Sequence, residues 1–198
     1  MVDKLHKFWP MFVIIIIPIL FSCASTQQKQ VESRDAKFYN NRGTDRGEKG
    51  QYDEAISDFK KAIEINPRYN KAYNNRGIVY RLKGQYDQAV SDFNKAIEIN
   101  PLDAEAYNNL AWLFATAKAG SFRNGKKAVE LAQKACELSE WRKAEYVDTL
   151  AAGYARIGDF ENAVKWQKKA LEYPKLATPS EFQERLNLYR ERKPWPAE

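Results

Sequence analysis

The chain has 198 residues, of which 44% are hydrophobic and 13% aromatic, a composition typical of a folded protein with a continuous core. Its formal net charge is +6, but lysine and arginine alternate with aspartate and glutamate, which favours solvated helix faces over a nucleic-acid-binding surface. The only histidine is His6, so the rest of the chain cannot use imidazole chemistry, and we expect no catalytic residue, no metal and no other cofactor.

Residues 1–22 have the pattern of a secretory signal peptide. Lys4 and Lys7 precede an apolar run from Phe8 to Phe21. A helix over this run would rise only about 21 Å, which is less than the roughly 30 Å of a bilayer's hydrocarbon core. The run is therefore too short for a comfortable membrane span and indicates a secretory signal. An uncleaved signal anchor is the alternative.

The end of this segment resembles the lipobox of bacterial lipoproteins. Residues 20–23 read LFSC, and the resemblance implies that residues 1–22 are removed and that Cys23 carries the lipid. Ala24 resembles the outer-membrane sorting signal of enteric bacteria. Several acyl chains together make a stable anchor, and residues 23–35 then form the lipidated cysteine and a polar, flexible tether. We therefore predict a lipid-anchored protein of the bacterial cell envelope, at the outer membrane and facing the periplasm.

An internal repeat follows the tether. Residues 36–69 and 70–103 align without a gap and are identical at 22 positions. The shared stretches are YNNRG (39–43 and 73–77), KGQYD (49–53 and 83–87) and KAIEINP (61–67 and 95–101). Each unit predicts two amphipathic helices, with glycine at the turn between them and proline after the second helix.

The residues that this repeat shares with a known family are its packing positions. They are Tyr73, Gly77, Tyr80, Gly84, Tyr86, Ala89, Phe93, Ala96 and Pro101. At these positions the chain resembles the tetratricopeptide-repeat (TPR) family. The resemblance implies an all-α fold, a TPR α-solenoid in which helix-turn-helix repeats form a right-handed superhelix.

Two weaker units and a cap complete the predicted array. Residues 104–140 form a TPR-like unit whose loop is enlarged by five residues, and residues 141–174 form a fourth unit. Residues 175–198 contain a capping helix and tail, introduced by a capping box, TPSE, at 178–181. An apolar stripe on this helix is predicted to cover the last repeat; it consists of Phe182, Leu186 and Tyr189.

In this family the first helices of successive units line a concave groove, so the resemblance also places the candidate binding residues. The predicted groove residues are Lys37, Asn40, Lys71, Asn74, Ile78, Arg81, Asn108 and Trp112, with Thr44, Glu105, Glu145 and Asp148 in equivalent places. Stacked asparagine amides beside Ile78 and Trp112 would hold a peptide backbone and one apolar anchor. The alternative is that the asparagines of YNN have no ligand.

Some TPR domains hold a partner's C-terminal carboxylate with a clamp of Lys, Asn and Arg, but that clamp is not expected here. Asn75 matches the clamp's position in the second unit. Asn40 and Thr44, and then Glu105 and Asn109, stand where lysine, asparagine or arginine would be required.

Three further features leave alternatives open. Cys136 is predicted to be a buried packing residue. The enlarged loop at 117–126 is either spacing variation or a functional loop. Trp141, Trp166 and Trp195 are predicted to lie outside the groove, with Trp166 serving either ordinary packing or a contact between copies.

The predicted function is that of a membrane-anchored scaffold or adaptor in envelope assembly. It would bind a protein or peptide partner through the concave groove and would bind no nucleic acid. A pilotin-like lipoprotein for a secretin or pilus machine is one alternative, and a self-associating structural repeat that forms a homo-oligomer is another. An enzyme is not expected, because the sequence has neither a nucleophile motif nor a phosphate-binding loop.

Overall fold

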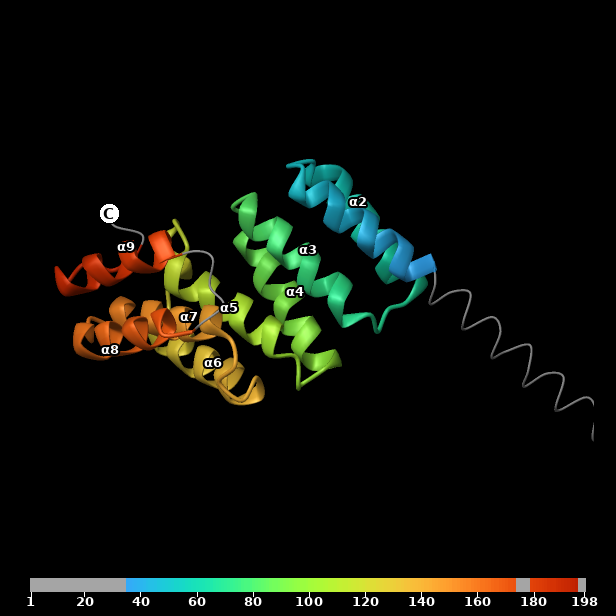
Figure 1. Ribbon diagram of the computed structural model, residues 1–198. Helices are drawn as coiled ribbons and strands as arrows, with labels where there is room; N and C mark the ends of the chain where they lie inside the picture. The colour runs from blue at the N-terminus through green and yellow to red at the C-terminus, as the bar shows by residue number, and fades with distance from the viewer. Residues whose placement is uncertain (1–34, 174–178, 196–198) are drawn as a thin grey trace, which may run out of the picture.

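The computed structural model describes residues 35–173 and 179–195, and all regular structure within these ranges is helical. Residues 35–48 form the first helix. The elements after it are α2 (Tyr52–Ile65), α3 (Asn70–Leu82), α4 (Tyr86–Ile99), α5 (Ala104–Thr116), the 3-10 helix η1 (Gly120–Phe122), α6 (Gly125–Leu138), α7 (Ala144–Arg156), α8 (Phe160–Leu171) and α9 (Pro179–Arg190). Figure 1 shows them as helix hairpins stacked in chain order, which confirms the predicted α-solenoid.

Several predictions concern segments that the structure does not describe. The signal peptide, Cys23 and the tether up to residue 34 lie outside the described residues, and so does the start of the capping box at Thr178. Within the described ranges, no helix combines the length and the apolar character that crossing a bilayer requires.

In each of the first two hairpins, a glycine of the first helix faces a phenylalanine of the second. A Cβ atom added to Gly77 would lie 2.8 Å from Cε1 of Phe93, and one added to Gly43 would lie 2.8 Å from Cε1 of Phe59. Both rings are fully buried. A larger residue at either glycine would push the two helices apart, so the small residues of the repeat permit the predicted close packing.

The turn between α4 and α5 shows how the sequence ends one unit and starts the next. Asn100 leaves the helical conformation, and its side-chain oxygen accepts a hydrogen bond from the Leu102 amide at 3.2 Å. Asp103 then caps α5, because its carboxylate accepts hydrogen bonds from the amides of Glu105 and Ala106. These caps satisfy backbone groups that the helix ends leave without partners.

An ion pair between an arginine and a buried aspartate also joins the two helices of each of the first two hairpins. Arg76 donates from Nε and Nη2 to the two oxygens of Asp92, both at 2.7 Å. Arg42 makes the same paired contact with Asp58, at 2.8 and 2.7 Å. The expectation of solvated charged faces is wrong for these aspartates, which are 5% and 1% exposed. They are tolerated in the core because each carboxylate receives a charge-assisted, two-point partner.

The third hairpin replaces this ion pair with an apolar contact. In register with the pair of the second hairpin stand Leu110 on α5 and Leu131 on α6, and Leu131 packs against the cluster that contains Leu110. At these equivalent positions the two helices of the third hairpin are therefore joined by hydrophobic burial instead of an ion pair.

The helix α9 closes the array on the side of α8, as predicted for a capping helix (Figure 1). Its apolar stripe is buried, with Phe182 6%, Leu186 3% and Tyr189 0% exposed. The stripe covers apolar surface of the last hairpin that would otherwise face water.

Candidate functional site

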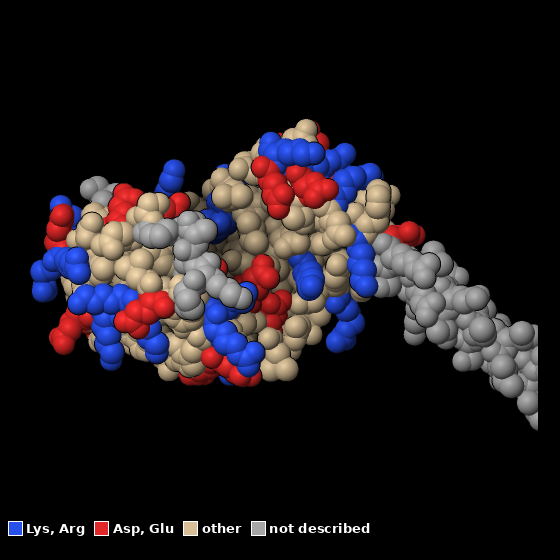
Figure 2. Space-filling model, viewed as in Figure 1, with Lys and Arg blue, Asp and Glu red and all other residues tan. Residues whose placement is uncertain are grey.

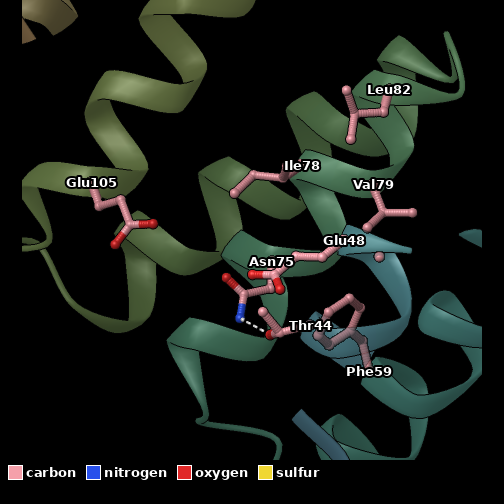
Figure 3. Close-up of a pocket in the computed structure, with 9 residues that line it drawn as sticks. Thr44, Glu48, Phe59, Asn75, Ile78, Val79, Leu82 and Glu105 are labelled. Carbon is pink, nitrogen blue, oxygen red and sulfur yellow. Dashed lines mark hydrogen bonds between the residues drawn. The ribbon is translucent and has the colours of Figure 1, made fainter. Parts of the chain in front are cut away.

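The first helix, α2, α3 and the start of α5 line an open pocket, drawn in Figure 3. Its volume is about 330 Å³. The residues that line it, which we call the groove pocket, are Thr44, Gly47, Glu48, Phe59, Asn75, Ile78, Val79, Leu82 and Glu105. Phe59 and Val79 are buried, whereas Leu82 is 50% exposed. The pocket thus offers apolar side chains that are open to a ligand.

The asparagines of the YNN motif join neighbouring units. Asn75 Nδ2 donates to Asn40 Oδ1 at 3.1 Å and to Thr44 Oγ1 at 3.3 Å. One unit later, Asn109 Nδ2 donates to Asn74 Oδ1 at 3.0 Å. The accepting residues Asn40 and Asn74 are 5% and 3% exposed. These amides therefore have partners within the chain, and the motif acts as a ladder of hydrogen bonds along the first helices.

The ladder ends at the fourth unit. The buried Oδ1 atom of Asn108, the next acceptor in the series, has no hydrogen-bond partner among the described residues. Thr149 stands where the next donating asparagine would be, and its hydroxyl donates instead to the Glu145 carbonyl at 2.9 Å. The sequence shows this substitution, but only the structure shows that an acceptor is left without a donor.

The structure brings some of the predicted groove residues together and separates others. Ile78 projects into the groove pocket, with Glu105 facing it from α5 (Figure 3). Lys37 and Lys71 are exposed and do not line the pocket. Arg81 lies at the end of α3, where it lines a second pocket together with lysine side chains and Leu82, which borders both pockets. Burial lowers the pKa of Arg81.

Trp112, on α5, is only partly exposed and packs against another part of the chain. The guanidinium carbon of Arg185, on α9, is 5.4 Å from the centroid of the Trp112 ring. Arg185 is 3% exposed and donates from Nε to Asp148 at 2.8 Å. Gln167 donates to the same carboxylate oxygen at 2.7 Å. Arg185 therefore occupies the face of Trp112 that the sequence offered as an anchor for a ligand.

Trp195 also lies close to Arg185, and its place outside the groove stays a prediction. Its ring centroid is 5.4 Å from the guanidinium carbon of Arg185. Arg156 Nη2 donates a hydrogen bond to the backbone carbonyl of Trp195 at 2.8 Å. The chain turns back after α9 because Arg192 adopts a φ of 59°, a left-handed conformation that ends the helix. The groove pocket, by contrast, lies in the N-terminal part of the array, between the first helix, α2, α3 and the start of α5.

Acidic charge surrounds the start of α5, next to the groove pocket. Burial raises the pKa of Tyr146 to about 12, and the carboxylates of Glu105, Asp103 and Glu145 contribute to this rise. Over the wider surface in Figure 2, basic and acidic side chains alternate, and acidic ones lie near the centre of the hollowed face.

The features for which the sequence left alternatives are packed within the chain. Cys136 is buried as predicted, and burial raises the pKa of its thiol to about 12. Trp141 and Trp166 stack with their ring centroids 5.2 Å apart. In the enlarged loop, Phe122 packs against Tyr86 at a centroid distance of 5.3 Å. Among the described residues, no cluster of His, Cys, Asp and Glu could hold a metal ion.

Comparisons with known proteins identify the repeat. Family models described as tetratricopeptide repeat match residues 71–102, 93–145 and 150–175, and one described as TPR repeat matches residues 47–84. No curated protein matches the sequence.

Solved structures match the fold over most of the chain. The pilF protein of Pseudomonas aeruginosa is 18% identical, with a TM-score of 0.70, and the match covers 81% of this chain and 71% of that one. PilW, described as a widely conserved type IV pilus biogenesis factor, is 17% identical, with a TM-score of 0.66 and coverage of 79% and 75%. A thermophilic TPR protein of Thermus thermophilus is 20% identical, with a TM-score of 0.66 and coverage of 79% and 82%. At these identities the similarity shows the fold alone.

Proposed function

Because the chain belongs to the tetratricopeptide-repeat family, we propose that it is a scaffold that binds a segment of another protein in the groove pocket. One observation carries this proposal: Leu82, 50% exposed, stands beside Ile78 at the mouth of an apolar pocket of about 330 Å³. Burying exposed apolar surface against a partner is favourable, and anchors in such pockets supply much of the affinity of protein interfaces.

The pocket is also held in shape before any partner arrives. Asn75 ties the first helix to α3 through Asn40 and Thr44, and the ion pair between Arg76 and Asp92 ties α3 to α4. Binding to a preformed site loses less conformational entropy, because fewer side chains and helices have to be ordered. These contacts favour a rigid docking site over one that assembles around its ligand.

We further propose that the scaffold works in the bacterial cell envelope, anchored by a lipid on Cys23 and facing the periplasm from the outer membrane. The signal-like residues 1–22 and the lipobox-like sequence at 20–23 support this location. A pilotin-like role is a candidate version, supported by the fold similarity to a protein described as a pilus biogenesis factor.

The binding proposal is tested by affinity capture from detergent-solubilised envelopes of the native host, with the full chain as bait. Leu82→Ser removes the exposed apolar side chain of the pocket. Leu102→Ser is the matched control, because Leu102 is 74% exposed in the turn before α5 and does not line the pocket. We expect one partner to be captured by wild type and by the control and to be lost from Leu82→Ser, with equal helix content in all three. Equal capture by all three would refute the groove pocket as the site.

The anchor is tested separately with Cys23→Ser, expressed in cells fed a labelled fatty acid. Wild type should incorporate the label and sediment with membranes, whereas the variant should do neither. Label in the variant, or its absence from wild type, would contradict lipidation at this cysteine.

A further inference from the structure

The charged side chains that line the groove pocket are both carboxylates. Glu48 comes from the end of the first helix and Glu105 from the first turn of α5. Figure 3 shows them reaching the pocket from these two separate elements. Their presence is notable because the chain as a whole is basic, with 32 Lys and Arg against 26 Asp and Glu.

No cation of the described chain neutralises these two groups. Glu105 accepts one hydrogen bond, from the neutral amide of Asn74 at 3.2 Å, and neither Glu48 nor Glu105 belongs to an ion pair. Other carboxylates of the first two units do have cations: Asp58 contacts Arg42 and Arg46, and Asp53 contacts Lys83. The carboxylates left without a cation thus include those that face the pocket.

A partner that covers this pocket removes water from both carboxylates. Such desolvation is unfavourable unless the partner supplies positive charge in return, and a partner's own carboxylates would be repelled. The same pocket is lined by Ile78 and Leu82, against which an apolar side chain of the partner would be buried. We therefore propose, as a specification of the proposed function on which it rests, that the bound segment carries an apolar side chain flanked by lysine or arginine.

A basic partner segment is the opposite in charge of the terminal carboxylate that a clamp of Lys, Asn and Arg binds. A clamp attracts a terminal carboxylate with lysine and arginine, whereas here Glu105 stands at a clamp position and Glu48 adds a second negative charge. An internal basic and apolar stretch of a partner protein fits the groove pocket, and an acidic C-terminus does not.

The test uses two fluorescent hexapeptides and the full chain in nanodiscs of zwitterionic lipid, with empty nanodiscs subtracted. One peptide has two leucines flanked on each side by two lysines, and the other has glutamates in place of the lysines. We expect the lysine peptide to bind at least about tenfold more tightly, by fluorescence anisotropy at low salt. Net protein charge alone predicts the reverse order, because the chain is +6.

Matched charge variants locate the effect. Glu48→Lys with Glu105→Lys should abolish or invert the preference for the lysine peptide. Glu54→Lys with Glu130→Lys makes the same change in net charge at residues outside the pocket and should leave the preference in place. Leu82→Ser, with Glu48 and Glu105 unchanged, should weaken binding of the lysine peptide.

Each contrary result has a defined meaning. The inference is overturned if the lysine peptide does not bind at about 1 mM, if the glutamate peptide binds as tightly, or if both charge variants behave alike. It is also overturned if light scattering shows a dimer that Leu82→Ser dissociates, because the occupant is then a second copy of the chain. The proposed function survives if envelope capture still depends on Leu82 but is unaffected by the two pocket charges.

Discussion

Replacing Asp92 with alanine isolates the role of the buried ion pair that joins α3 to α4. The variant removes both oxygens to which Arg76 donates at 2.7 Å and leaves a guanidinium whose side chain is only 16% exposed. The loss should therefore exceed that of a surface ion pair, because the remaining charge cannot return fully to water.

The magnitude follows from this partial exposure. Removing one member of a fully buried pair costs about 3–5 kcal/mol. Since Arg76 keeps some contact with solvent, we expect Asp92→Ala to lower the free energy of unfolding by about 2–4 kcal/mol. Urea unfolding of the full chain in one mild detergent, followed by circular dichroism at 222 nm, measures the difference.

The third hairpin supplies the control. A variant with Arg76→Leu and Asp92→Leu reproduces the Leu110 and Leu131 contact found at the equivalent places. Without a stranded charge it should be more stable than Asp92→Ala and within about 1 kcal/mol of wild type. A loss below about 1 kcal/mol for Asp92→Ala, or a double variant no more stable than the single one, would refute the reasoning.

Three more predictions follow from other packing features. Gly77→Ala places a Cβ atom 2.8 Å from the Phe93 ring. Although alanine has the better helix propensity, this close contact should lower the free energy of unfolding by about 1–3 kcal/mol in the same urea assay. An unchanged unfolding midpoint would mean that the helices can separate freely. Cys136, with a thiol pKa raised to about 12, should resist a thiol-specific reagent at pH 8 in the Cys23→Ser variant and react once urea unfolds that chain. Rapid labelling of the folded variant would contradict the burial of Cys136. Hydrogen bonding from Arg42 lowers the pKa of Asp58 below its usual value. The ionised Asp58 therefore contributes fully to the free energy of unfolding above the unfolded pKa of about 3.9, and this contribution is lost as pH falls through the lower folded pKa. The stability difference between wild type and Asp58→Asn should accordingly be constant from about pH 5 to 7 and shrink below about pH 4, and a difference that grows with acid would show the opposite linkage.

The fold follows from the sequence because its signals are local and repeated. Gly77 and Phe93 recur as Gly43 and Phe59 one unit earlier, and each pair meets in the same way. A repeat in which every unit contacts its neighbours leaves few alternatives for the chain path, so periodicity and turn residues suffice to predict the helices and the capping helix.

The candidate site could be predicted only in part. The family resemblance placed Ile78 on the groove face, and the structure has it in the groove pocket. It could not show that the amides of Asn40 and Asn74 are engaged by Asn75 and Asn109, because a hydrogen bond between units depends on the offset of neighbouring helices. The 34-residue spacing of these asparagines would predict the ladder of hydrogen bonds only if the offset of neighbouring helices were already known.

The sequence by itself determined the repeat, its helices and the family, because these depend on side chains a fixed number of residues apart. Only the tertiary structure decided which surface is open. Trp112 and Trp195 are far apart in sequence, yet Arg185 contacts both rings after the chain turns back at Arg192. Such contacts are set by the packing of α9 on the last hairpin, a long-range outcome that no local spacing encodes. They place Arg185 against Trp112 in the C-terminal part of the array, whereas Leu82, in the N-terminal part, stays 50% exposed.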